Sequence, residues 1–167
     1  MPYFSCNDEG FWDIGPESLR WMKVLAEAIN VKFARFPLGD PDDDATPFAS
    51  VLAMPPNYEL WRHKHDCHRV EVVVSGSLQV GDRVLHPGDV MTSTPGEAYG
   101  PHVAGPEGSV TVEIFSNRRG VSFEFDANPD PQVVGFFERL LADPDPERRA
   151  AASVGLARSG LRIPERG

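Results

Sequence analysis

Residues 57–76 read NYELWRHKHDCHRVEVVVSG, and five positions within this stretch decide the fold. Asn57, His63, His65, Arg69 and Gly76 are separated by five, one, three and six residues. His63 and His65 are one residue apart, so on a strand their side chains point to the same face. Two imidazoles placed in this way can share one metal ion or one bound molecule. The stretch therefore predicts one half of a site inside a β structure.

A second stretch, residues 88–103, reads GDVMTSTPGEAYGPHV and supplies the other half of this site. Its positions Gly88, Thr94, Gly96, Tyr99 and Val103 are separated by five, one, two and three residues. Turn residues divide the whole of 47–125 into short apolar runs, which is typical of a β-sandwich or barrel. No internal repeat is present, so we expect one barrel.

Both patterns resemble the two sequence motifs of the cupin superfamily, in register and without a gap. The resemblance implies a mainly β fold, a cupin-type double-stranded β-helix or jelly-roll barrel, with an N-terminal helix and C-terminal helices added. In the family the first motif has Gly, His, His, Glu and Gly, and the second has Gly, Pro, Gly, His and Asn. Arg69 stands at the glutamate place and Tyr99 at the third histidine place. Asn57 replaces the first glycine, and asparagine tolerates the left-handed backbone that a glycine would supply.

A divalent transition metal is implied by the resemblance, because cupin metal sites typically use three histidines and one glutamate. An arginine beside a cation would disfavour this ion, and only two histidines match. Strand alternation that points Arg69 inward also points Glu71 inward, and Gly100-Pro101 can turn His102 back toward the site. The first hypothesis is a metal-centred enzyme, of dioxygenase or isomerase or lyase type, acting on a small organic molecule. Its metal, Fe, Mn, Ni or Zn, would be held by His63, His65, Glu71 and His102.

A metal-free alternative uses the two substituted residues as catalytic residues. Arg69 offers a forked donor suited to a carboxylate or phosphate, and Tyr99 offers a phenol beside two tunable bases. This set predicts an acid–base enzyme for an anionic small molecule. A third hypothesis is a non-catalytic sensor or binding module for a small molecule. Trp61 shares the inward face and is expected to form a pocket wall, and Glu71 can instead pair with Arg69.

The ends of the chain are predicted to be helical. Gly15-Pro16 indicates the start of a helix over residues 16–30, and a strand from Val31 to Pro37 follows. Asp130-Pro131 and Asp145-Pro146 each place an N-cap before a proline, which predicts two helices within residues 130–160. We expect the second to be the weaker and residues 161–167 to fray. The parts are 1–46 (N-terminal helix and first strand), 47–125 (barrel) and 126–167 (helical extension), in one compact domain.

The composition limits the partners. The net charge of −9 argues against nucleic acid, and no apolar run approaches the length of a membrane span. Two cysteines and the absence of a secretory pattern lead us to expect a cytoplasmic location. A homodimer is also expected, since cupins often pair and the apolar face formed by Phe136, Phe137, Leu140 and Leu141 needs cover.

Overall fold

A computed structural model describes residues 2–126 and 128–163, and it confirms the mainly β fold with helices at both ends. The helical elements are η1 (Phe11–Asp13), η2 (Glu17–Leu19), α1 (Arg20–Glu27), η3 (Arg119–Val121), α2 (Pro131–Leu141) and α3 (Pro146–Ser159). The strands are β1 (Lys32–Pro37), β2 (Phe48–Met54), β3 (Glu59–Leu60), β4 (Lys64–His65), β5 (Arg69–Val80), β6 (Arg83–Leu85), β7 (Val90–Ser93), β8 (His102–Phe115) and β9 (Phe123–Glu124).

Most of the strands belong to one antiparallel sheet in the order β1-β2-β8-β5-β6, with β3 added to β8 and β7 added to β5. A second, two-stranded sheet joins β4 to β9. The two longest strands, β5 and β8, pair with register shifts between Val73 and Ser75 and between Gly76 and Leu78. Such bulges bend a strand and increase its twist, which curls the sheet around its inner face. Gly81-Asp82, one of the turns that divide residues 47–125, forms the hairpin that joins β5 to β6.

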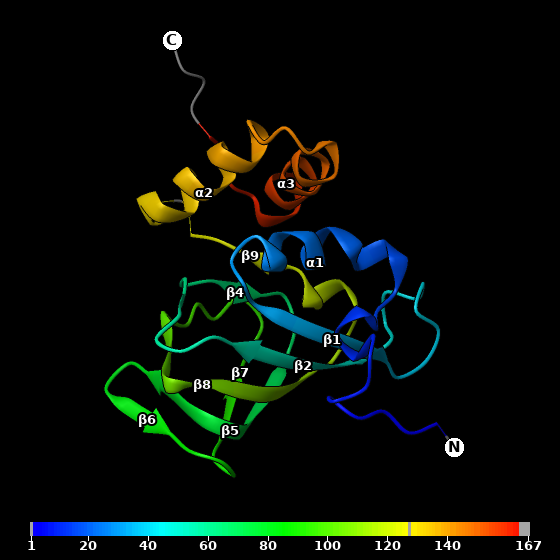
Figure 1. Ribbon diagram of the computed structural model, residues 1–167, viewed down its shortest axis with the longest axis vertical. Helices are drawn as coiled ribbons and strands as arrows, with labels where there is room; N and C mark the ends of the chain where they lie inside the picture. Colours follow the sequence, from blue (N-terminus) through cyan, green and yellow to red (C-terminus); the bar gives the residue numbers. More distant parts are fainter. Residues whose placement is uncertain (1, 127, 164–167) are drawn as a thin grey trace.

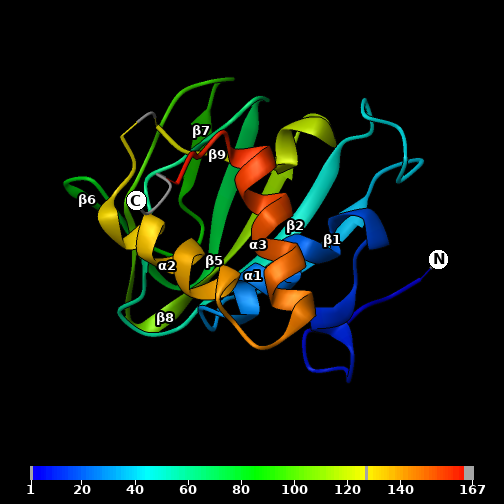
Figure 2. The ribbon, with the colours of Figure 1, turned by 90° about the horizontal axis from the view of Figure 1, so that it is seen from above.

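The helices gather at one end of the strands (Figure 1) and lie across that end when the molecule is seen from above (Figure 2). One apolar cluster holds them together through Leu25 of α1, Phe137 of α2 and Ala152 of α3. Trp61, from the segment between β3 and β4, packs against the same cluster. The helices are therefore fixed to the end of the barrel by shared apolar packing.

Both C-terminal helices begin where the Asp-Pro pairs predict. The side chain of Asp130 accepts a hydrogen bond from the backbone N–H of Gln132, and Asp145 does the same for Glu147. The N-terminal helix is shorter than the predicted 16–30. Its first turn is the 3-10 helix η2 and α1 ends at Glu27, after which Asn30 adopts a φ of 57°. This left-handed backbone cannot continue an α-helix, so the chain turns into β1.

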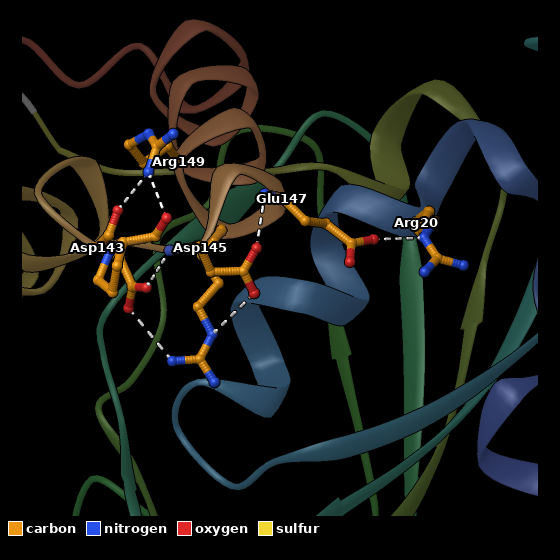
Figure 3. Close-up of polar contacts among 7 residues, drawn as sticks. Arg20, Asp143, Asp145, Glu147 and Arg149 are labelled. Carbon is orange, nitrogen blue, oxygen red and sulfur yellow. Dashed lines mark hydrogen bonds and ion pairs between the residues drawn. The ribbon is translucent and has the colours of Figure 1, made fainter.

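Close packing holds α3 on α1, although the sequence predicted a weak helix. A Cβ atom on Gly155 would lie 2.8 Å from Cδ1 of Leu25 and 3.0 Å from Cε1 of Phe137, so a glycine is needed at this contact. Arg20 also donates a 2.7 Å hydrogen bond to Glu147, which links the two helices at the surface (Figure 3). Of the stretch expected to fray, Leu161 is buried in the helical cluster, and residues 164–167 lie outside the described residues.

The apolar face of α2 is covered by the chain itself. Phe136, Phe137 and Leu140 are buried, and only Leu141 is exposed, to 37%. The expected need for a second subunit to cover this face is therefore wrong, and the homodimer remains a prediction without that support. Among the described residues, no helix combines the length and the apolar character needed to cross a membrane.

Candidate functional site

A row of polar side chains crosses the inner face of the barrel. It consists of successive register partners on four adjacent strands, namely Arg35 (β1), Ser50 (β2), Glu113 (β8) and Glu71 (β5). Register partners in an antiparallel sheet point to the same face, so the four side chains lie next to one another. Arg35, Ser50 and Glu71 are buried, and the Glu113 side chain is 12% exposed. The barrel therefore encloses two carboxylates and a guanidinium in one row across its strands.

Arg69 adds a second guanidinium, one inward position further along β5. Its Nη1 atom lies 2.8 Å from Oε2 of Glu71 and also forms an ion pair with Oε1 of Glu113. Burial lowers the pKa of Arg69, but the charges of Glu113 and Glu71 outweigh burial and raise it above its ordinary value. Pairing of Glu71 with Arg69 is the alternative that the sequence left open. Arg69 therefore already forms ion pairs with two carboxylates of its own chain.

The Tyr99 ring lies at the centre of the other candidate residues. The guanidinium carbon of Arg69 is 4.2 Å from its centroid, and the ring centroids of His63 and His102 are 4.8 and 5.2 Å away. The hydroxyl oxygen is buried and has no hydrogen-bond partner among the described residues. Burial raises the pKa of Tyr99 well above its usual range, so the phenol stays protonated at neutral pH.

His63 and His65 lie side by side with their ring centroids 5.1 Å apart. Nδ1 of His63 is 2.7 Å from the backbone oxygen of Trp61, and Nδ1 of His65 is 2.9 Å from that of Gly120. A carbonyl oxygen only accepts hydrogen bonds, so we assign the proton of each ring to Nδ1 and the lone pair to Nε2. Metal-binding histidines are often held by the same kind of hydrogen bond, so the Nε2 atom of each ring is in the state in which it could bind a metal ion.

Burial keeps the three histidines of the site neutral. Burial, with a smaller contribution from the charge of Arg69, lowers the pKa of His63 to about 3 and that of His102 to about 4. The pKa of His65 also lies well below its usual value, because of burial and then of His63. Groups with such low pKa values are poor bases at neutral pH. The histidines therefore offer lone pairs and ring surface, not proton uptake.

The four expected metal ligands are not gathered around one point. Glu71 is held by Arg69, and His102 stacks on Tyr99 at an interplanar angle of 25°. Within residues 2–126 and 128–163, no group of three or more His, Cys, Asp or Glu side chains is arranged to hold a metal ion. The Arg69 charge lies where the family's glutamate would neutralise a cation. The residues present therefore do not fit the metal centre that the resemblance implies.

An apolar cavity of about 120 Å³ lies between the polar row and the helices. Its walls are mainly aliphatic and aromatic, and they include Met22, Leu25, Leu52, Trp61, Phe123 and Phe136. The polar residues that line it are Arg35, Ser50, His63, His65 and Glu113. Arg69, Glu71, Tyr99 and His102 are not among its lining residues. Of the candidate site residues named from the sequence, only the His63–His65 pair and Trp61 line this space.

Three polar residues of the cavity wall have no predicted role in the sequence. Nothing in the sequence around Ser50 predicts a role for it. The alternation of residues around Glu113 does not tell whether the Glu113 side chain faces inward or outward. Arg35 does carry a weak signal, because it alternates in phase with Phe33, whose side chain also lines the cavity. A charged residue in phase with a partly buried aromatic residue indicates an interior role, but only the register of β1 on β2 places Arg35 beside the site.

Glu113 is the residue of this wall whose protonation changes near neutral pH. Burial raises the pKa of Glu113 to about 7, which Arg69 opposes and Glu71 reinforces. A carboxyl group with a pKa near the working pH can both accept and return a proton. The cavity therefore combines an apolar body with one acid–base group.

The chain is similar to several solved structures at low sequence identity. No protein-family model and no curated protein sequence matches the chain. Among solved structures it is similar to KdgF from Halomonas sp., at 25% identity over 53% of this chain and 81% of that chain, with a TM-score of 0.43. An RmlC-like cupin from Ralstonia eutropha is 19% identical over 68% of this chain and 76% of that chain, with a TM-score of 0.46.

A third similar structure is an acetylacetone dioxygenase from Acinetobacter johnsonii, which is 10% identical over 69% of this chain and 74% of that chain, with a TM-score of 0.47. These values say nothing of a shared activity. The order of the elements confirms the mainly β architecture with helices at both ends, and the likeness to a cupin-type barrel rests on the two sequence motifs.

Proposed function

We propose that the protein binds a small, mainly apolar organic molecule in the cavity between the barrel and the helices. The cavity itself is the observation that supports this function. An engineered apolar cavity of about 150 Å³ in another protein binds benzene. A space of about 120 Å³ suits a molecule of that size or slightly smaller. Binding sites of this kind are apolar with a few polar groups that fix the orientation of the ligand, as on the wall that carries Arg35 and Glu113.

The geometry favours this function over the other two hypotheses. A metal-centred enzyme needs ligands that converge, and Glu71 is instead paired with Arg69. Binding of an anion by Arg69 would require it to leave two buried carboxylates, which is costly in an apolar interior. Of the functions predicted from the sequence, the small-molecule binding module agrees best with the observed contacts.

Binding of benzene tests the proposal. Benzene should raise the melting temperature of the wild-type protein and shift the NMR signals of residues that line the cavity, such as Leu52 and Val121. Val121→Phe should fill the cavity and abolish both effects, whereas Val154→Phe, which places the same side chain on the exposed face of α3, should leave them intact. If Val121→Phe does not fold, Leu25→Phe takes its place. Unchanged NMR spectra of the wild type at saturating benzene would contradict the proposal.

The position of Glu113 on the cavity wall, together with its raised pKa, supports a second candidate function, acid–base catalysis in the same cavity. The ionised carboxylate of Glu113 would take a proton from the carbon next to a carbonyl group and leave an enolate. The Glu113 carboxyl group would then exchange this proton for a deuteron from solvent and give the deuteron to the same carbon, which restores the ketone and the carboxylate. Deuterium exchange into a small ketone, measured by NMR, should rise through a pKa of about 7 and disappear in Glu113→Gln. Exchange at the same rate in both proteins would contradict this candidate and leave the binding function untouched.

A further inference from the structure

Arg35 is a buried guanidinium that has no carboxylate partner of its own. It is 6% exposed, and its guanidinium carbon lies 3.7 Å from the centroid of the Phe33 ring. Its Nε atom has no hydrogen-bond partner among the described residues, and none of the ion pairs in that part of the chain includes Arg35. A buried charge without a counter-charge is unfavourable, so this position calls for a negative group.

The other interior arginine shows the contrast. Arg69 contacts both buried carboxylates, Glu71 and Glu113, whereas Arg35 receives only a longer-range attraction from Glu113. Burial lowers the pKa of Arg35 to about 9, an effect that Glu113 reduces, so the group still carries its charge at neutral pH. Arg35 therefore keeps its charge at the cavity wall, whereas the two buried carboxylates, Glu71 and Glu113, pair with Arg69.

Ser50 provides a second donor beside Arg35. The two residues are register partners on β2 and β1, and both line the cavity. Ser50 is 3% exposed, and its Oγ atom has no hydrogen-bond partner in the described part of the chain. Two neighbouring donors on one wall, a guanidinium and a hydroxyl, match the two oxygens of a carboxylate.

We propose that Arg35 and Ser50 bind the carboxylate of the ligand, so that the cavity takes small acids with a compact apolar body. This inference rests on the proposed binding function and names the ligand class. It also moves the anion-binding role from Arg69, where the sequence placed it, to a residue on the first strand. The apolar part of the acid would lie against Leu25 and Trp61, which line the cavity and belong to the helical cluster.

Isobutyrate and isobutyramide provide a matched pair of probes, because they have the same shape and differ in charge. In NMR titrations at pH 7, the wild type should bind isobutyrate at least roughly tenfold more tightly than isobutyramide. Arg35→Met should remove this preference and still bind benzene and isobutyramide. Ser50→Ala should weaken isobutyrate binding several-fold, and Arg20→Met, an exposed arginine on α1, should change nothing.

The outcomes separate the two proposals. Binding of benzene together with equal binding of the two probes by the wild type would overturn the role of Arg35 and keep the binding function. A preference for isobutyrate that survives in Arg35→Met would overturn it as well. No binding of benzene or of either probe would overturn the binding function itself. If Arg35→Met does not fold, Arg35→Gln is measured in its place with the same expected loss of preference.

Discussion

The guanidinium carbon of Arg69 lies 4.2 Å from the centre of the Tyr99 ring, so the two residues that stand in for the family's glutamate and histidine contact each other. A guanidinium on an aromatic face is favourable, and more so when it is shielded from water. The same guanidinium pairs with Glu71 and Glu113. The two residues therefore act as one unit, in which the charge of Arg69 is balanced by two carboxylates and covered by an aromatic ring.

Reversal of both replacements should create a metal site. Arg69→Glu combined with Tyr99→His gives the chain the residue types of the family pattern beside His63 and His65. We expect about one divalent transition metal per chain in the double variant after loading with Fe, Mn, Ni or Zn, and none retained stoichiometrically by the wild type. Elemental analysis after desalting measures both. Further replacement of His63 and His65 by alanine is the control, which should lose the metal again. Stoichiometric metal in the wild type would contradict the claim that the charge of Arg69 disfavours a cation in this site.

Removal of the Arg69 charge should strongly destabilise the fold. Arg69→Met leaves Glu71 and Glu113 buried without their cation, and breaking a buried pair in this way costs about 3–5 kcal/mol. Arg119→Met removes an exposed ion pair with Asp66 and should cost less than about 1 kcal/mol. Denaturant unfolding measures both changes. Similar free energies of unfolding for the two variants would show that the buried charges do not depend on Arg69.

Stability should fall as the pH drops from 6.5 to 4.5. The folded protein keeps His63, His65 and His102 neutral, whereas in the unfolded chain they take up protons below about 6.5. Glu113 acts in the opposite sense, because its raised pKa lets the folded state hold a proton that the unfolded state has released above about 4.5. The unfolded chain therefore binds about two more protons than the folded protein in this range. The free energy of unfolding should then change by about 2.7 kcal/mol per pH unit.

Denaturant unfolding across this pH range tests that slope. His102→Gln removes one of the three histidines, so its stability should depend on pH less steeply, by about one proton or 1.4 kcal/mol per pH unit. A wild-type stability that does not change between pH 6.5 and 4.5 would mean that the histidines are protonated in the folded state.

Gly76 should tolerate no side chain. Its φ is 69°, and a Cβ atom there would lie 2.0 Å from the backbone oxygen of Gly108 on the paired strand. Gly76→Ala must therefore move one strand from the other, and we expect a loss of more than about 4 kcal/mol. Gly81 has a similar φ of 60° but open space around it, so Gly81→Ala should cost only about 1–2 kcal/mol. Equal losses would show that backbone strain alone, not the strand contact, requires the glycine.

The barrel was predictable because its signals are local. The left-handed Asn57, the hairpin at Gly81-Asp82 and the caps Asp130 and Asp145 each depend on a few neighbouring residues, and each is observed. The site was less predictable because its contacts join distant parts of the chain. One of the two partners of Arg69, Glu113, is 44 residues away along the chain.

The position of Arg35 also could not be predicted from neighbouring residues. Its place beside Ser50 follows from the pairing of β1 with β2, and its side of the sheet depends on which face the curled barrel encloses. Strand alternation in one sequence says which residues share a face but not which face is inside. The sequence therefore pointed to an arginine as the group that binds an anion and named Arg69, which is paired with Glu71 and Glu113, whereas our proposal gives this role to Arg35.

The row from Arg35 through Ser50 and Glu113 to Glu71 also determines how the strands can align while the protein folds. Side chains alternate along a strand, so a slip of β8 by one residue against β5 would turn Glu113 to the outside and bring Val112 or Ile114 opposite Glu71. Arg69 would then lose one of its two carboxylates inside an apolar interior, at a cost on the order of several kcal/mol. An all-aliphatic interior would penalise the same slip far less, so the enclosed charges select one alignment of the barrel.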